Sequence, residues 1–289
     1  MNLYTHHSLI SYRFVFPMKK VLQYKSSQIA YYTYGSGNEI LLFFHGYGLT
    51  GESFAVLQPV LETDYTLICI DLPFHGATNW QEGLVFSEED LWEVLLLLKP
   101  LYDKPFSLMG YSMGGRIALS LLEKHPQQIK QVALVAPDGL KFNWWQAIAT
   151  HTAVGNLLFS YTMQHPQWLF ALIRVASFCK LIDRSVEVFT LLYISEEQER
   201  QLLYKRWHAM RDYAPRLSEL RKLINQYKIP VNLLFGAYDK VITTRQGYAF
   251  KKNEPLITIR ELKCGHQLIK EKYAAELGQL LGKNIPTAI

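Results

Sequence analysis

The stretch FSLMGYSMGGRIALSLLEKH, residues 106 to 125, decides the fold. A short apolar run from Phe106 to Met109 comes first, the pentapeptide GYSMG (Gly110 to Gly114) follows, and an amphipathic stretch from Arg116 to His125 comes last. This order predicts a strand, a sharp turn and a helix. Glycines on both sides of Ser112 tolerate strained dihedrals at the turn and leave no Cβ where strand and helix cross closely.

The turn around Ser112 has the form that a catalytic serine needs. A serine hydroxyl is a weak nucleophile near neutral pH, so it has to stand clear of its neighbours and be given a base. The pattern G-x-S-x-G also occurs by chance, and a purely structural turn is the alternative interpretation. The strand before it and the helix after it favour a nucleophile.

The composition predicts a globular protein. The chain has 289 residues, enough to bury a large core, and it is 49% hydrophobic and 19% charged. Its net charge is +5, but the basic residues are scattered among acidic ones without a long run of Lys or Arg. Nucleic-acid binding is therefore not expected.

Cysteine usage and hydropathy bear on the compartment. Cys69, Cys179 and Cys264 are odd in number and far apart, which fits neither a disulfide framework nor a zinc site, and we expect a cytoplasmic protein. No stretch approaches the roughly 18 apolar residues of a membrane span, so no integral membrane association is expected. Residues 1 to 17 lack the features of a signal peptide and are predicted to be a flexible leader, with the folded unit beginning at Met18.

Apolar runs predict a parallel sheet. Runs without alternation are typical of strands covered on both faces, and besides Phe106 to Met109 they are Ile40 to Phe44, Tyr65 to Ile70, Val132 to Val135 and Val231 to Phe235. Residues 21 to 34 hold two β-prone runs around Lys25 to Gln28, which predicts an antiparallel hairpin.

Helical segments alternate with these strands. They are expected at Glu52 to Leu61, at Glu88 to Leu98 and at Arg116 to His125, and the alternation predicts right-handed crossovers. Ser87, with Asp90 three residues later, resembles a capping box that starts the second helix.

The alternation of predicted strands and helices stops after Asp138. No further parallel-strand pattern occurs until Val231, and a structureless loop of that length would be unusual in a compact domain. We therefore predict a helical cap over residues 140–226, inserted into an α/β core formed by 18–139 and 227–289.

Polar residues follow four of the predicted strands, where ligands bind in open α/β sheets. They are HGYG (His45 to Gly48), Ser112, Asp239 and His266. Their types, in the chain order nucleophile, acid, base, suit acyl transfer.

Together with DLPFHG (Asp71 to Gly76), GAYD ending at Asp239 and CGH ending at His266, these motifs resemble the α/β-hydrolase superfamily from about Ile29 to Leu281. The resemblance implies a mostly parallel sheet flanked by helices, with an inserted helical cap and neither metal nor cofactor. The HGYGL start and the Met after the serine look most like small capped serine carboxylesterases, of the EC 3.1.1 type.

The resemblance also implies roles. Ser112 would attack an ester-type carbonyl, His266 would accept the serine proton and later protonate the leaving group, and Asp239 would orient the imidazole. The backbone N–H groups of Tyr47 and Met113 would form the oxyanion hole.

Alternatives stay open for several residues. Asp138 also follows an apolar strand and is the second candidate for the acid, and His266 has the alternative of an ordinary loop histidine. We expect His45 to shape the oxyanion loop and His75 to stabilise its own loop by a hydrogen bond. Phe74 stands where glycine is frequent in the superfamily.

The predicted cap is rich in aromatic side chains. Most are expected to pack the cap helices together, and Trp144 and Trp145 are candidates to line a substrate pocket because they follow the Asp138 loop. We expect a small or medium ester with an apolar acyl group as the substrate. An aminopeptidase or carbon–carbon bond hydrolase with the same triad is the alternative, and a non-catalytic ligand receptor on the same fold is another.

Overall fold

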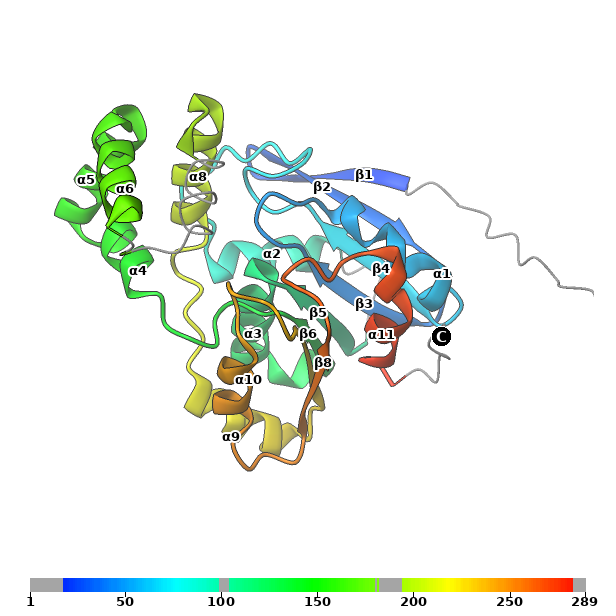
Figure 1. Ribbon diagram of the computed structural model, residues 1–289. Coiled ribbons are helices and arrows are strands. Elements are labelled where there is room, and N and C mark those ends of the chain that lie inside the picture. The colour runs from blue at the N-terminus through cyan, green and yellow to red at the C-terminus, as the bar shows by residue number, and fades with distance from the viewer. Residues whose placement is uncertain (1–17, 99–103, 180, 182–193, 283–289) are drawn as a thin grey trace, which may run out of the picture.

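The computed structural model describes residues 18–98, 104–179, 181 and 194–282. Its centre is an eight-stranded sheet in the order β1-β2-β4-β3-β5-β6-β7-β8 (Figure 1). The predicted leader, residues 1 to 17, lies outside the described residues.

The strands begin and end close to the predicted runs. They are β1 (Met18–Tyr24), β2 (Ser27–Tyr34), β3 (Glu39–Phe44), β4 (Tyr65–Ile70), β5 (Phe106–Tyr111), β6 (Ile129–Val135), β7 (Val231–Gly236) and β8 (Ile257–Leu262). β1 pairs with β2 and β2 with β4 in antiparallel register, whereas every pair from β4 through β8 is parallel. The expected mostly parallel sheet and its initial hairpin are therefore confirmed.

The central strands are mostly apolar because both faces of the sheet are covered. Leu42 and Phe44 of β3 pack into one core cluster, and Leu41 and Phe43 pack into the other. All four are fully buried. Alternate side chains of a strand point to opposite faces, so a strand between two helical layers needs an apolar residue at every position.

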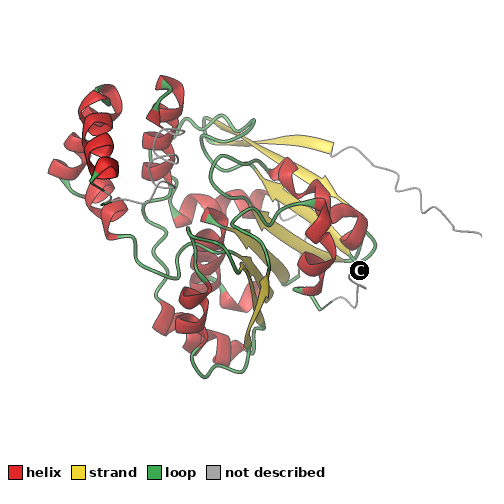
Figure 2. Ribbon diagram, in the orientation of Figure 1, coloured by secondary structure: helices red, strands yellow, loops and turns green. Residues whose placement is uncertain are grey.

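Helices cover both faces of the sheet (Figure 2). α2 (Glu88–Leu97) begins with the expected capping box, in which Ser87 and Asp90 bond each other's backbone N–H groups. The other helices that cover the sheet are α3 (Met113–Lys124), α9 (Leu217–Tyr227), α10 (Thr244–Lys251) and α11 (Ala274–Gln279). Short 3₁₀ turns occur at Pro126–Gln128 and Glu271–Tyr273.

Two helices differ from the expectation. The segment expected as one helix from Glu52 is a 3₁₀ helix (Gly51–Leu57) followed by the single turn α1 (Gln58–Leu61). Pro59 has no N–H to donate to the carbonyl of Ala55, which instead accepts from the N–H of Gln58 in the 3₁₀ pattern. α3 starts three residues before the expected position, directly after Ser112.

Glycines allow β5 and α3 to cross closely, as expected. A Cβ added to Gly114 would lie 1.9 Å from the carbonyl oxygen of Phe44, and one added to Gly110 would lie 2.5 Å from that of Gly114. No real Cβ atom fits at such distances from backbone, so only glycine keeps the helix this near the strands.

Four helices between β6 and β7 stand to one side of the sheet (Figure 1). They are α4 (Trp144–His151), α5 (Ala153–Gln164), α6 (Gln167–Phe178) and α8 (Glu197–Ala209). α9, which ends near the predicted cap boundary, packs on α3 of the sheet layers. The division into a core and a cap over 140–226 stays a prediction.

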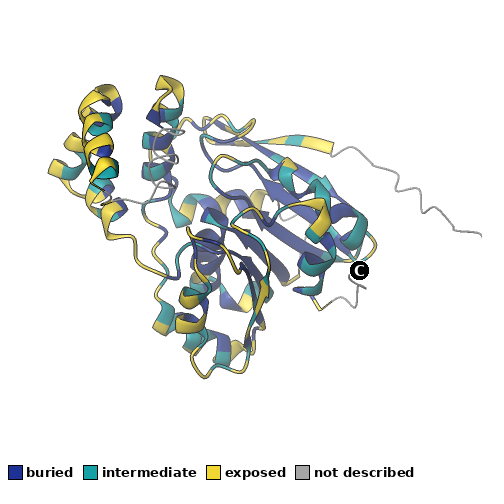
Figure 3. Ribbon diagram, viewed as in Figure 1, coloured by how far each residue is buried: buried dark blue, intermediate teal, exposed yellow. Residues whose placement is uncertain are grey.

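The sheet and the inserted helices differ in burial. The central strands β3, β4, β5, β6 and β7 are largely buried, whereas the edge strand β1 and much of the surface of α5 and α6 are exposed (Figure 3). In the part of the chain that the structure describes, no helix combines the length and the apolar character needed to cross a bilayer.

The close crossing generates a stability prediction. Gly114→Ala should lower the free energy of unfolding by about 3 kcal/mol or more, because its Cβ would displace the backbone of β3. Chemical denaturation measures the change. Gly265→Ala is the matched control, since a Cβ there meets nothing within 4 Å, and it should change stability by less than about 0.5 kcal/mol. Equal effects of the two substitutions would contradict the prediction.

Candidate active site

Ser112 lies at the end of β5 in a strained conformation. Its φ of 48° and ψ of −116° are outside the ordinary range of a serine, and it is the N-cap of α3. Such a conformation costs on the order of 1–3 kcal/mol and persists only when the surroundings enforce it. Here the serine N–H donates to the carbonyl of Val135 (3.0 Å), and the serine carbonyl accepts from the N–H of Asp138 (2.8 Å).

The structure brings Ser112, His266 and Asp239 together. Nε2 of His266 lies 3.1 Å from Oγ of Ser112, and its Nδ1 lies 2.7 Å from Oδ2 of Asp239. Because a carboxylate only accepts, Nδ1 carries the proton and Nε2 is left to accept from the serine hydroxyl. The arrangement has the geometry of a nucleophile with an oriented base.

The Asp239 carboxylate is fully buried and held on both oxygens. Its Oδ1 accepts from the N–H groups of Val241 (2.8 Å) and Ile242 (3.0 Å), while Oδ2 faces His266. Burial by itself would raise the pKa of Asp239, but the hydrogen bonds from His266, Ile242 and Val241 outweigh it and lower the pKa below its ordinary value. Asp239 is therefore a carboxylate at neutral pH.

The second candidate for the acid has other partners. Asp138 forms an ion pair with the buried guanidinium of Arg116 and accepts a hydrogen bond from the N–H of Gly139 (2.7 Å). Arg116 also donates to Oε1 of Gln146 in α4 (2.8 Å). Asp138 thus ties α3 to the start of the inserted helices, whereas Asp239 is the carboxylate at the imidazole.

The two predicted oxyanion donors flank the serine. Met113 is the first residue of α3, and the HGYG loop passes beside the nucleophile. A Cβ added to Gly46 would lie 3.3 Å from Cβ of Ser112 and 2.9 Å from the ring of Tyr111. The use of the Tyr47 and Met113 N–H groups as oxyanion donors stays a prediction.

His45 is buried, and both of its ring nitrogens form hydrogen bonds with backbone groups. Its Nδ1 donates to the carbonyl of Gly46 (2.8 Å), and its Nε2 accepts from the N–H of Leu72 (3.0 Å). These two bonds require the neutral ring with the proton on Nδ1. Burial lowers the pKa of His45 to about 4, which fits a residue that shapes the loop.

His75 stabilises the DLPFHG loop in a similar way. Its Nδ1 donates to the carbonyl of Pro73 (2.9 Å), and burial lowers its pKa to about 2. Phe74 has a φ of 62°, so the residue that replaces the frequent glycine adopts the left-handed conformation at a steric cost. The Tyr47 ring meets the His75 ring edge-on, with centroids 6.0 Å apart.

Arg206, in α8, is a residue that the sequence analysis missed. Its Nε donates to the carbonyl of Phe74 (3.0 Å), and its guanidinium carbon lies 5.0 Å from the centroid of the Tyr47 ring. The side chain is buried, with 8% exposure. One cation therefore joins α8 to both loops beside the serine. Nothing in the spacing of α8 distinguishes it from its exposed neighbour Lys205.

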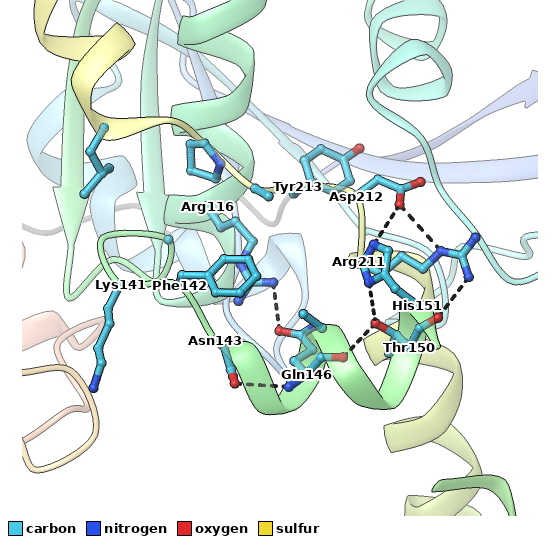
Figure 4. Close-up of a pocket in the computed structure, with 15 residues that line it drawn as sticks. Arg116, Lys141, Phe142, Asn143, Gln146, Thr150, His151, Arg211, Asp212 and Tyr213 are labelled. Carbon is cyan, nitrogen blue, oxygen red and sulfur yellow. Dashed lines mark hydrogen bonds and ion pairs between the residues drawn. The ribbon is translucent and has the colours of Figure 1, made fainter. Parts of the chain in front are cut away.

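Trp144 and Trp145 stack on each other at the start of α4, with ring centroids 3.8 Å apart, and both are exposed. A cavity of about 490 Å³ lies beside α4, between the connections that lead into and out of the inserted helices. Figure 4 shows Arg116, Gln146, Arg211 and other polar residues around it. Neither tryptophan lines that cavity, and their place in a substrate pocket stays a prediction.

Within the described ranges, no group of three or more His, Cys, Asp or Glu side chains is placed to hold a metal ion.

The buried histidines generate a prediction for stability against pH. The pKa of His75 is lowered on folding, so the unfolded chain binds a proton below about pH 6.5 that the folded protein excludes, and stability falls as the pH falls. Removing one such group should reduce the slope of the unfolding free energy by about 1 kcal/mol per pH unit between pH 6 and 5.

The measurement is urea unfolding of the wild type and of His75→Asn across that range. Substitution of the exposed His165 by Asn is the control and should leave the slope unchanged. Parallel curves for wild type and His75→Asn would contradict the assignment of a buried, neutral His75.

Sequence comparisons give relatives with hydrolase names. A model of the alpha/beta hydrolase fold family matches residues 39–171. A pimeloyl-[acyl-carrier protein] methyl ester esterase from Chromobacterium violaceum is 34% identical over 131 residues, which cover 44% of this chain and 49% of that protein. The uncharacterized hydrolase YugF of Bacillus subtilis is 24% identical over 241 residues, covering 82% and 86%. The match thus spans about half the length of the first relative.

Solved structures show the same fold. The thioesterase domain from the curacin biosynthetic pathway superposes with a TM-score of 0.61 at 19% identity, covering 92% of this chain and 99% of that one. The enol-lactonase from Burkholderia xenovorans LB400 gives 0.62 at 19% identity, covering 91% and 98%. The names of these relatives are those of an esterase and a hydrolase. The family match, the strand order and the structural likeness agree, and the chain has the α/β-hydrolase fold.

Proposed function

We propose that the protein is a serine hydrolase that cleaves a small or medium ester through an acyl-enzyme intermediate. The observation that carries this proposal is the hydrogen-bonded chain from Oγ of Ser112 through His266 to the buried Asp239. A hydroxyl, an imidazole in the correct tautomer and an ionised carboxylate are the groups that acyl transfer to serine requires.

In the acylation step, Oγ of Ser112 attacks the ester carbonyl while Nε2 of His266 takes the hydroxyl proton. The tetrahedral oxyanion accepts hydrogen bonds from the N–H groups of Tyr47 and Met113, each worth about 3 kcal/mol in comparable sites. The imidazolium then returns its proton to the alkoxide oxygen of the leaving alcohol as the carbon–oxygen bond breaks.

Deacylation repeats these steps with water. Nε2 of His266 takes a proton from a water molecule, whose oxygen attacks the acyl carbonyl, and the proton then passes to Oγ of Ser112 as the acid leaves. The buried negative charge of Asp239 stabilises the imidazolium in both halves of the cycle. No cofactor or metal enters the proposed reaction.

The proposed substrate carries an apolar acyl group. Tyr47 packs into an apolar cluster of the inserted helices that includes Phe159, Phe170 and Trp207, so the serine loop adjoins apolar surface. The esterase names of the relatives favour an ester over an amide. The cytoplasm is the proposed compartment, because all three cysteines are free thiols.

A fluorophosphonate probe tests the activated serine. The wild type should be labelled and should hydrolyse p-nitrophenyl esters, and Ser112→Ala should lose both properties while keeping its circular dichroism spectrum. Asp239→Asn should lower kcat by roughly a thousandfold or more, because the imidazole then loses its correct tautomer.

Asp138→Asn is the comparison for the acid, with thermal unfolding measured alongside because the substitution removes the partner of Arg116. A folded Asp138→Asn protein should keep kcat within about tenfold. A folded wild type that resists labelling would refute the serine mechanism and favour a ligand receptor. Turnover of amino-acid p-nitroanilides in place of esters would favour a peptidase.

Arg206 should affect the reaction through the loop that carries Tyr47. Arg206→Met keeps a chain of similar length but loses the bond to the carbonyl of Phe74 and the contact with the Tyr47 ring. We expect kcat for a short ester to fall about tenfold with little change in KM, because oxyanion stabilisation is lost in the transition state alone.

Two further variants separate positioning from stability. Arg206→Lys should recover part of kcat, since an ammonium keeps the cation beside the ring. Lys205→Met, one residue away and exposed, loses only a contact of 5.8 Å between its ammonium and the Phe74 ring and keeps the hydrogen bond from Arg206, so it should change kcat by less than about twofold. A loss of stability in Arg206→Met without a change in kcat would show that the residue only fastens α8.

A further inference from the structure

α5 and α6 each expose an apolar face, which we call the outer faces. On α5 the face consists of Val154, Leu157, Leu158 and Tyr161, and on α6 of Trp168, Leu172, Val175 and Phe178. These side chains are between 40% and 89% exposed, and the two helices are drawn largely in the colour of exposed residues in Figure 3.

The spacing shows that each outer face is a continuous stripe. Positions 154, 157, 158 and 161 of α5 recur at intervals of three and four residues, and so do 168, 172 and 175 of α6. Side chains at this spacing lie on one side of a helix. An apolar stripe of this kind ordinarily faces a core.

Each helix already has a core on its opposite side. Met163 and Phe159 of α5 and Leu169 and Phe170 of α6 pack into the same apolar cluster with α8. At 100° per residue, Met163 lies on the side of α5 opposite Leu158 and Tyr161. The outer faces are therefore a second apolar surface, beyond what packing of the inserted helices uses.

Exposure of this much apolar surface to water is unfavourable, and a binding partner that covered the surface would remove the unfavourable contact with water. Contiguous exposed patches on soluble proteins mark interaction sites for proteins or membranes, whereas scattered single residues do not. Eight large apolar side chains on two neighbouring stretches of chain are not a scatter. Figure 1 shows α5 and α6 on the far side of α8 from the sheet.

Charge indicates the kind of occupant. The sequence from Gly139 to Ile182 contains no Asp or Glu, although it includes Lys141 and Arg174. Arg174 is exposed and directly precedes Val175 of the outer face, whereas Lys141 lies before α4, beside the cavity. Helices with Trp, Phe and Leu on one face and cations at its border bind the interface of anionic bilayers.

We propose that the outer faces of α5 and α6 dock reversibly on an anionic phospholipid surface. The apolar stripes enter the boundary between headgroups and acyl chains, and Arg174, at the border of the α6 stripe, contacts lipid phosphates. A second copy of the chain is a poorer occupant, because outer faces without acidic residues offer no partner to the Arg174 side chain of the other copy. Docking in this way would give the proposed hydrolase direct access to esters whose apolar acyl groups partition into lipid.

Vesicle sedimentation of the full chain tests the proposal independently of catalysis. The probes are vesicles of equal parts phosphatidylglycerol and phosphatidylcholine, compared with phosphatidylcholine alone. The protein should bind the anionic vesicles, and added salt should weaken the binding. Ser112→Ala should bind equally well, so a failure of the hydrolase proposal and a failure of docking are distinguishable.

Three variants localise the contact. Leu157→Ser with Leu158→Ser alters α5, and Leu172→Ser with Val175→Ser alters α6. At least one of these pairs should reduce partition to anionic vesicles about tenfold or more, and Arg174→Glu should reduce it severalfold. Val21→Ser, an exposed apolar residue on the edge strand β1, is the matched control and should leave binding unchanged.

Two results would overturn the proposal. One is a folded wild type that fails to sediment with anionic vesicles, or whose binding survives both paired substitutions. The other is a dimer in sedimentation velocity that dissociates on the paired substitutions and ignores vesicles, which would assign the outer faces to a second copy. Circular dichroism and thermal unfolding establish that each variant is folded.

Discussion

The close approach of α3 to β3 and β5 is the constraint on which the rest of the site depends. Gly110 and Gly114 allow backbone to meet backbone there, and this contact forces Ser112 into a conformation with positive φ. The hydrogen bonds of Ser112 to Val135 and Asp138 hold that conformation on two sides. A strained residue enforced by its neighbours presents its side chain beyond the strand ends, where loops from distant parts of the chain converge.

Those loops are held mainly by buried polar groups with backbone partners. Asp239 accepts hydrogen bonds from two backbone N–H groups in addition to its contact with the imidazole, and His45 forms hydrogen bonds with the backbone of both Gly46 and Leu72. A buried polar group that is fully bonded fixes geometry, because any movement leaves it unsatisfied in a medium of low dielectric constant. The imidazole of His266 thereby points at Ser112 in the protein without a ligand, which would reduce the reorganisation that the proposed reaction requires.

The inserted helices have two distinct relations to their surroundings. On the inner side, Arg206 connects α8 to the loops of Tyr47 and Phe74, so the position of these helices is coupled to the neighbourhood of the serine. On the outer side, α5 and α6 expose apolar stripes opposite the side chains that pack with α8. Helices with apolar residues on both sides are typical of elements that lie between two partners.

The sequence by itself determined the sheet and the nucleophile turn, because local patterns dictate both. The doubly covered strand β3 is apolar at every position from Ile40 to Phe44, and glycines mark the crossing at Ser112. Only the tertiary structure showed which of the two aspartates faces the imidazole, because Asp239 and Asp138 both follow apolar strands. Asp239 lies against His266, whereas Asp138 lies against Arg116. The role of Arg206 could not be predicted from the sequence either, because its partner Phe74 is 132 residues away. Their contact depends on how α8, which lies outside the sheet, packs against the loop that holds Phe74.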